Sequence, residues 1–195
     1  VAAFIRGQGA ICLVLGLFYA IGLSWAGINY GLLVGLTTGL LAFVPVIGWL
    51  AGEWGVTDSV GVDGHWVDPL KLRIPGESFL SADLRRPFRL DRTFDLAVST
   101  ETAEHLPEES AGGFVESLTC LAPVILFSAA APFVPGNLHI NCQWPSYWAS
   151  LFRERGFVTT DPIRRKVWTD KRVRWFYSQT MLLFVKQDAL RHFPS

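Results

Sequence analysis

The chain has 195 residues, which is enough for one ordinary domain or for a small domain with an appendage. Its 17 basic and 17 acidic residues balance to a formal net charge of zero. Because residues of the two signs are mixed, the sequence has no basic stripe of the kind that would indicate a nucleic-acid partner. The three cysteines, Cys12, Cys120 and Cys142, are widely scattered, and no pair has the spacing of zinc ligands. We therefore predict free thiols in a reducing compartment and no metal site.

The charged residues are unevenly distributed along the chain. From Gly7 to Gly52 there is no Asp, Glu, Lys, Arg or His. This run is long enough for two membrane crossings of about 20 residues each. It predicts a transmembrane helical hairpin over residues 1–48 that contacts the membrane through residues 10–50. A signal peptide fits less well because the apolar run is too long, and a buried hydrophobic hairpin of a soluble protein is the remaining alternative.

The same segment, "FIRGQGAICLVLGLFYAIGLSWAGINYGLLVGLTTGLLAFVPVIGWLAG", resembles part of the autoinducer-2 exporter (PerM-like) permease family. The likeness covers about the first 50 residues and rests on Arg-Gly-Gln at Arg6 to Gln8, on the regularly placed glycines and on the "FVPVIG" ending. It implies a permease fragment with a non-catalytic cytoplasmic appendage as one function class. The expected location is then a membrane with a cytoplasmic soluble domain, or the cytoplasm if the hairpin does not insert.

Residues 49–188 have the pattern of an α/β domain, followed by a short tail over residues 189–195. Apolar runs that predict strands are "SVGVDG", "ESFLSADL", "TFDLAVST", "APVILFSAA", "GFVTTDPIRRKVW" and "SQTMLLFVKQ". Helices are predicted over residues 107–121 and over "QWPSYWASLFRERGF", which Gly156 ends. Strands that alternate with helices favour a parallel sheet covered by helices on both faces.

Ligands of such sheets bind outside the carboxyl ends of the strands, so polar residues at strand ends are candidate site residues. Asp63, followed by Gly64, can accept hydrogen bonds from both hydroxyls of a ribose; a plain Asp-Gly turn is the alternative. Asp83 can accept a hydrogen bond from an adenine amino group, or can cap a turn or helix.

The stretch "FDLAVSTETAEHLPEES" places Ser99, Glu101, Glu104 and His105 after an apolar strand. A carboxylate and an imidazole at a strand end can serve as acid, base or binding groups. A solvated loop with helix-capping residues is the alternative, and because Glu104 and His105 are adjacent, at least one of them is expected to point away from a site.

The stretch "HINCQWPSYW" places His139, Asn141 and Gln143 before a predicted helix, with Trp144 next to them. These residues could line an acceptor pocket, or they could be helix-capping residues and core aromatics. Downstream, the basic residues of "RRKVWTDKRVRW" are expected on a solvated hairpin face.

The order of "GVDGHWVD", "FLSADL", "FDLAVSTETAEHLP" and "FVESLTCLAPVILFSAAAP" resembles a class I S-adenosylmethionine-dependent methyltransferase. The likeness continues through "HINCQWPSYWASLFRERGF" and covers roughly residues 49–186. It implies a Rossmann-like sheet and S-adenosylmethionine as the cofactor, with a small molecule or another, unknown acceptor. By this resemblance Asp63 and Gly64 hold the ribose, Asp83 and Leu84 the adenine, and Ser99 and Glu101 the methionine part. His105 is then the catalytic base, and His139, Asn141, Gln143 and Trp144 bind the acceptor.

The sequence departs from this family at the glycine-rich loop that follows the first strand. In its place stands "AFVPVIG", in which Gly48 belongs to no Gly-x-Gly array and Pro45 disfavours a central strand. We therefore expect a sheet whose first strand is missing or replaced, with reduced cofactor affinity. A binding protein that keeps the fold without activity is a third function class.

Overall fold

The computed structural model describes residues 55–68, 72 and 74–192. The chain divides into two compact units, residues 1–61 with 68–80, and residues 62–67 with 81–195. The predicted hairpin over residues 1–48, the permease resemblance and the replaced first strand lie outside the described residues. Within the described ranges, no helix combines the length and apolarity needed to cross a membrane.

Two short strands come first along the described chain. β1 (Gly61–Asp63) and β2 (Phe79–Ser81) form a two-stranded sheet, and a 3-10 turn, η2 (Gly76–Ser78), leads into β2. Both strands fall within the predicted apolar runs. The Asp63 carbonyl accepts a hydrogen bond from the Ala82 N–H at 2.8 Å, so the chain segments that carry Asp63 and Asp83 are joined by their backbones.

The main sheet has four strands in the order β3-β4-β6-β5. They are β3 (Ala97–Thr100), β4 (Val124–Ser128), β5 (Phe157–Thr160) and β6 (Leu182–Lys186). β3 and β4 are parallel, as predicted, whereas β6 lies antiparallel to both β4 and β5. The expectation of a wholly parallel sheet is therefore wrong, because an apolar run indicates a strand but does not carry its direction.

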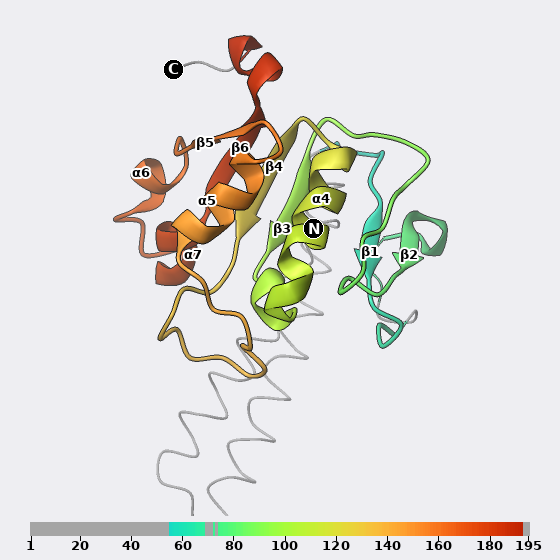
Figure 1. The fold of residues 1–195 in the computed structure, drawn as a ribbon, viewed down its shortest axis with the longest axis horizontal. Helices are drawn as coiled ribbons and strands as arrows, with labels where there is room; N and C mark the ends of the chain where they lie inside the picture. The colour runs from blue at the N-terminus through green and yellow to red at the C-terminus, as the bar shows by residue number, and fades with distance from the viewer. Residues whose placement is uncertain (1–54, 69–71, 73, 193–195) are drawn as a thin grey trace, which may run out of the picture. The chain divides into compact units, whose positions relative to one another are not determined.

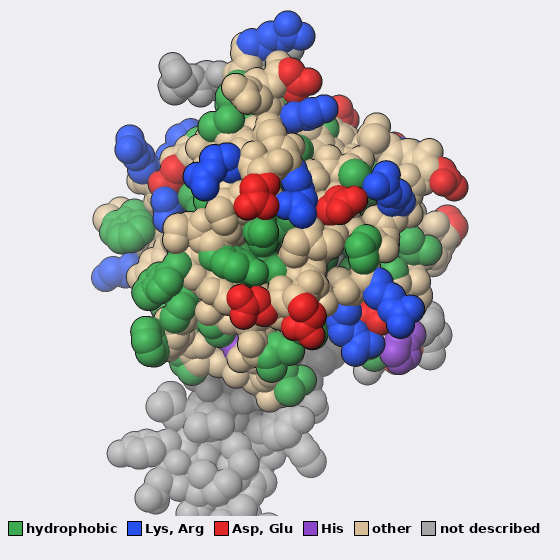
Figure 2. All heavy atoms as spheres, in the orientation of Figure 1, with side chains coloured by type: hydrophobic (Ala, Val, Ile, Leu, Met, Phe, Trp, Pro, Cys, Tyr) green, Lys and Arg blue, Asp and Glu red, His purple; other side chains and the backbone are tan. Residues whose placement is uncertain are grey.

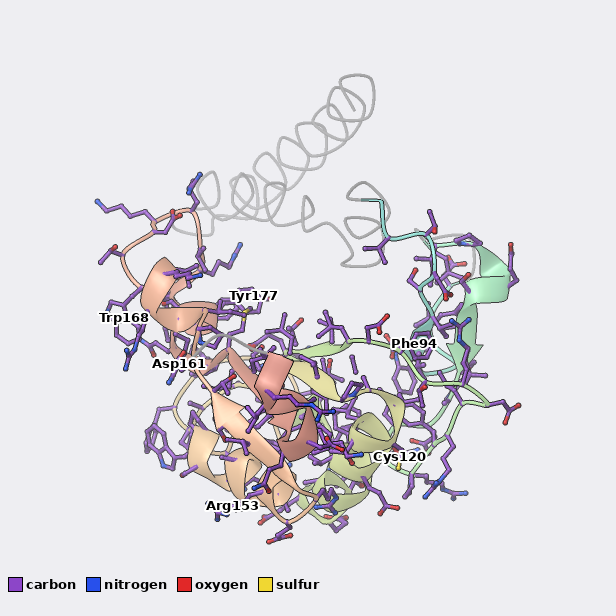
Figure 3. The ribbon with its side chains drawn as sticks, turned by 90° about the horizontal axis from the view of Figure 1, so that it is seen from above. Phe94, Cys120, Arg153, Asp161, Trp168 and Tyr177 are labelled. Carbon is purple, nitrogen blue, oxygen red and sulfur yellow. The ribbon has the colours of Figure 1, made fainter. Side chains whose placement is uncertain are left out.

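Two helices lie on one face of this sheet. They are α4 (Ala111–Leu121), after the 3-10 turns η3 (Ala103–His105) and η4 (Glu108–Ser110), and α5 (Pro145–Arg153). Short helices α6 (Arg164–Val167) and α7 (Trp175–Thr180) join β5 to β6, and η5 (Gln187–His192) follows β6. Tyr177 on α7 lies across the sheet from Cys120 and Arg153 on the first two helices (Figure 1, Figure 3). The strand predicted through "DPIRRKVW" ends at Thr160, and α6 occupies its second half.

The core lies between α4, α5 and the sheet face that they cover. Phe127 of β4 makes edge contacts with Phe152 of α5 and with Phe184 of β6, at centroid distances of 5.4 and 6.0 Å. Phe152 and Phe184 stack at 3.9 Å with an interplanar angle of 14°. This aromatic cluster anchors α5 to the strands, and α5 in turn fixes the end of the loop over residues 129–144.

Gly156 ends α5 in the left-handed region, with φ of 78°, and its N–H donates to the Arg153 carbonyl at 3.0 Å. A side chain is strained at this φ by about 1 kcal/mol or more, although the surrounding space is open. We expect Gly156→Ala to lower the melting temperature by about 3 °C. Gly76→Ala is the matched control, because Gly76 also faces open space without a positive φ. Equal melting temperatures for the two variants in a calorimetric scan would contradict this account of the α5 end.

Candidate functional site

The site is built at one edge of the main sheet. Because β3 and β4 run parallel with Thr100 opposite Ser128, their carboxyl ends meet at the same edge. The segments that leave this edge are η3 after β3 and residues 129–144 after β4. They bring the predicted site residues of "STETAEH" and "HINCQW" to the same place.

Glu101 follows β3 with an unusual backbone conformation, a φ of 52° in a residue that is not glycine. Its N–H donates to the Ser128 carbonyl at 3.0 Å, and its Oε1 accepts from the Ser128 hydroxyl at 2.8 Å. Burial is the main cause that raises the pKa of Glu101, and the neighbouring Glu104 carboxylate adds to it. A strained residue held by two contacts at a strand end is typical of a functional position.

Glu104 is fully buried, with 0% of its surface exposed. Neither carboxylate oxygen has a hydrogen-bond partner that meets ordinary geometry, and burial raises its pKa. Its backbone carbonyl accepts the N–H groups of Ile140 and Asn141 at 2.9 and 3.0 Å. These two bonds fix residues 139–141 against η3, with an acidic side chain buried beside them.

His105 and His139 come from separate loops and meet at this point. Their ring centroids are 5.0 Å apart in an edge-to-face arrangement. His105 Nδ1 lies 3.1 Å from the Leu138 carbonyl, which only accepts hydrogen bonds, so in the neutral ring Nδ1 carries the proton and Nε2 has the lone pair. His139 Nδ1 is buried without a partner. The structure therefore brings together the predicted base and one predicted acceptor-binding residue.

The other predicted acceptor residues follow on the same loop. Asn141 is buried, and its Oδ1 accepts from Gln143 Nε2 at 3.1 Å while its Nδ2 has no partner. Trp144 precedes α5 and is more than half exposed. Trp148 is buried and packs in the core against Phe127, at 5.2 Å between centroids.

Asp63 and Gly64 lie at the end of β1, as predicted. Asp63 Oδ1 accepts from the Gly64 N–H at 2.6 Å, which is the geometry of the Asp-Gly turn that the sequence left open. A Cβ on Gly64 would overlap the Trp66 ring, so this position needs glycine unless the largely exposed ring moves. Trp66, which sequence reasoning did not single out, is thus an aromatic surface beside the predicted ribose-binding pair.

Asp83 is engaged by Arg85 on both carboxylate oxygens. Arg85 Nε and Nη2 donate at 2.8 and 2.9 Å and its N–H at 3.1 Å, and the guanidinium lowers the pKa of Asp83 to about 2. Leu84 is buried in the core cluster. The turn alternative therefore describes the observed Asp83, and an adenine ring would have to share these two residues with their present contacts.

Two further polar residues complete the edge. Ser99, on β3, is buried, and its hydroxyl has no partner. Tyr177 comes from α7, and its hydroxyl has a raised pKa because of burial and, next, the charge of Glu101. Ser99 was predicted as a site residue; Tyr177 and Ser128 were not, since Tyr177 lies in no strand-end motif and Ser128 reads as part of an apolar strand.

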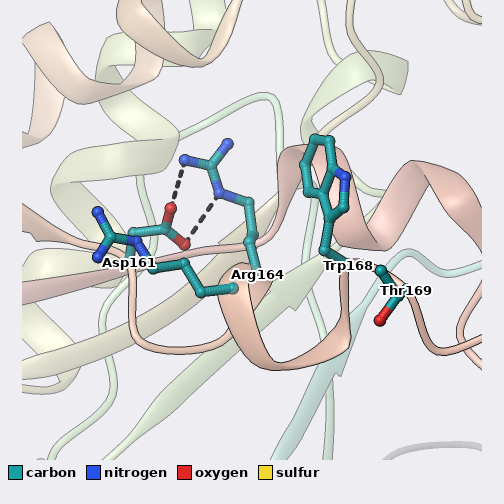
Figure 4. A pocket seen from close by; sticks show the side chains of 5 residues that line it. Asp161, Arg164, Trp168 and Thr169 are labelled. Atoms are coloured by element: carbon teal, nitrogen blue, oxygen red, sulfur yellow. Dashed lines mark hydrogen bonds and ion pairs between the residues drawn. The ribbon is translucent and has the colours of Figure 1, made fainter.

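A pocket of about 530 Å³ lies on the β5–α7 segment, lined by Asp161, Arg164, Arg165, Trp168 and Thr169. Arg164 Nε and Nη2 donate to the two Asp161 carboxylate oxygens at 3.0 and 2.7 Å (Figure 4). Arg164 Nη1 also donates to the Gln179 carbonyl at 2.8 Å. Basic and acidic side chains are interspersed on the face drawn in Figure 2. The residues of "RRKVW" form α6 instead of the expected hairpin, and most of their charged side chains are exposed.

Comparisons with known proteins are sparse. No protein family profile matches the chain, and no curated protein matches it. Among solved structures, the chain is similar to magnesium protoporphyrin IX methyltransferase (ChlM) from Synechocystis PCC 6803 with bound SAH, at 17% identity and a TM-score of 0.42. This match covers 72% of the chain and 80% of the other protein. So low a TM-score establishes neither a shared fold nor a shared activity, and the permease resemblance has no support here.

Proposed function

We propose that residues 49–188 form a class I methyltransferase-like domain that binds S-adenosylmethionine with reduced affinity and transfers its methyl group to a small acceptor. The observation that carries the proposal is the convergence of His105, His139 and Glu101 at the carboxyl edge of the parallel β3–β4 pair. That edge is where α/β sheets bind ligands.

Two polar groups in this structure are available to bind the methionine end of the cofactor. The buried Ser99 hydroxyl has no partner, and Glu101 is a carboxylate whose charge is disfavoured by burial. An ammonium group placed beside Glu101 would restore the charged form. The adenine end fits less well, because Arg85 already occupies Asp83 and Leu84 is part of the core. Together with the absent glycine array, this supports reduced affinity.

Bound S-adenosylmethionine supplies an electrophilic methyl group, so the protein mainly aligns the acceptor. The Leu138 carbonyl orients the His105 ring, and the lone pair on Nε2 can take a proton from an acceptor hydroxyl. His139 and Asn141 offer further polar contacts. Four exposed apolar side chains on the same loop favour an acceptor with an apolar part: Phe133, Leu138, Ile140 and Trp144.

The ribose assignment is tested by titrating S-adenosylhomocysteine into purified Asp63→Ala and wild-type protein in a calorimeter. Loss of hydrogen bonds to a charged acceptor is worth about 1.5–3 kcal/mol, so we expect binding about tenfold to a hundredfold weaker. Asp91→Ala is the control, since Asp91 is an exposed loop residue. Binding that is the same in all three proteins would refute the ribose role. A protein that binds the cofactor but methylates no acceptor would instead support the non-catalytic alternative.

A further inference from the structure

We infer that Glu104, His105 and His139 form a binding site for one divalent transition-metal ion. One ligand atom from each residue lies within 4.8 Å of the other two. Around a tetrahedral ion with metal–ligand distances of about 2.0–2.2 Å, ligand atoms stand about 3.4 Å apart. Small side-chain rotations therefore suffice to bring the three ligand atoms within bonding distance of one ion.

The buried carboxylate is the strongest indication. Glu104 is fully buried, and neither of its carboxylate oxygens has a hydrogen-bond partner of ordinary geometry, so its charged form is costly. Glu101 is the other carboxyl group near it, and the charge of Glu104 helps to raise the pKa of Glu101. A cation bound between Glu104 and the two imidazoles supplies the missing partner, and buried charges in proteins are generally paired or bound to metal.

The two histidines are held as metal ligands are usually held. His105 Nδ1 donates to the Leu138 carbonyl, which orients the ring and leaves Nε2 as the nitrogen available to an ion, and a metal-binding histidine commonly has such a second hydrogen bond. Leu138 itself has a φ of 58°, an uncommon conformation for leucine. The Nε2 edge of His139 lies against Gly136, where a Cβ would overlap the ring, so its buried Nδ1 is the available nitrogen.

The donor set indicates the kind of ion. Two imidazoles and one carboxylate favour Zn²⁺ and similar ions over Mg²⁺ or Ca²⁺, which prefer oxygen ligands. Three protein ligands leave a further position open to water or to an acceptor oxygen, and the exposed His105 ring leaves this side of the site accessible. In the metal-bound protein His105 is a ligand, and its Nε2 no longer serves as a base. This site depends only on the three side chains and not on the proposed methyltransferase activity.

The test uses the untagged full chain, stripped of metal with EDTA and dialysed. We expect Co²⁺ to bind at one ion per chain with visible absorption bands, Zn²⁺ to displace it, and Mg²⁺ not to compete. His105→Ala and His139→Ala should each weaken binding by at least about tenfold. His65→Ala, at an exposed histidine elsewhere, should leave binding unchanged.

Three outcomes would overturn the inference. They are no Co²⁺ absorption, a Co²⁺ affinity in the two histidine variants that equals that of the wild type, or a thiolate-to-cobalt charge-transfer band that places the ion on cysteine. Circular dichroism of each variant confirms folding, and Glu104→Gln, a nearly isosteric change, is a second variant expected to abolish tight binding. The same preparations are titrated with S-adenosylhomocysteine. Cofactor binding without metal binding refutes this inference alone, and metal binding without cofactor binding refutes only the proposed function.

Discussion

Replacing Phe127 by Ala is expected to lower the free energy of unfolding by about 3–5 kcal/mol. Phe127, on β4, is 2% exposed and contacts Trp148, Phe152 and Phe184. Truncation removes its buried area and leaves a cavity that the stacked Phe152 and Phe184 rings cannot fill without moving. In a chain of this size the loss corresponds to about 6–20 °C in melting temperature.

Phe133→Ala is the matched control, because Phe133 follows β4 by a few residues and is 95% exposed. We expect its stability to change by less than about 0.5 kcal/mol. Both variants are compared by urea unfolding, and Phe127→Leu provides a milder change if the alanine variant does not fold. Similar midpoints for Phe127→Ala and Phe133→Ala would contradict the placement of the core between α5 and the sheet.

Replacing Glu104 by Gln is expected to stabilise the metal-free protein at neutral and alkaline pH. Burial raises the pKa of Glu104 in the folded protein above its ordinary value, so folding favours the protonated form over the charged one. The wild type is therefore most stable at acidic pH, and it loses stability as pH rises through the raised pKa. The neutral amide avoids this loss, for a gain of about 2 kcal/mol at pH 8, or about 6 °C.

The measurement is a set of thermal unfolding curves in EDTA between pH 4 and pH 8. We expect the wild type and Glu104→Gln to converge toward the acidic end and to diverge toward pH 8. Glu116→Gln, at an exposed position on α4, should follow the wild type at every pH. A Glu104→Gln variant that is less stable than the wild type at pH 8 would show that the carboxylate has a partner after all. Saturating Zn²⁺ should stabilise the wild type and leave this variant almost unchanged.

The sequence predicts the strands of this fold better than their arrangement. β3 and β4 are apolar runs bounded by polar residues, and their parallel pairing follows from the helix between them. The position of β6 between β4 and β5 depends on long-range pairing, such as Leu183 opposite Leu126, that no local pattern contains. The short α6 was missed because a basic tetrapeptide has no apolar periodicity.

The candidate site, like the sheet, depends on long-range contacts that local sequence patterns do not contain. Strand-end position singled out Ser99, Glu101 and His105, which lie within or shortly after β3 in the structure; their roles remain predictions. The adjacency of Glu104 and His105 suggested that one of them points away from the site. The 3-10 turn η3 instead lets both reach His139, because two N–H groups of the 139–141 segment bond to the Glu104 carbonyl. These hydrogen bonds join segments that are far apart in the sequence, so no local sequence pattern predicts them.

Calorimetric titration of S-adenosylmethionine into the wild-type full chain tests the central claim most directly. We expect saturable binding of one molecule per chain, with a dissociation constant of about 100 μM, because the sequence lacks the glycine array that would hold the methionine carboxylate. No binding at millimolar cofactor would contradict the methyltransferase-like site altogether. A dissociation constant in the low micromolar range would contradict the claim that the site is weakened.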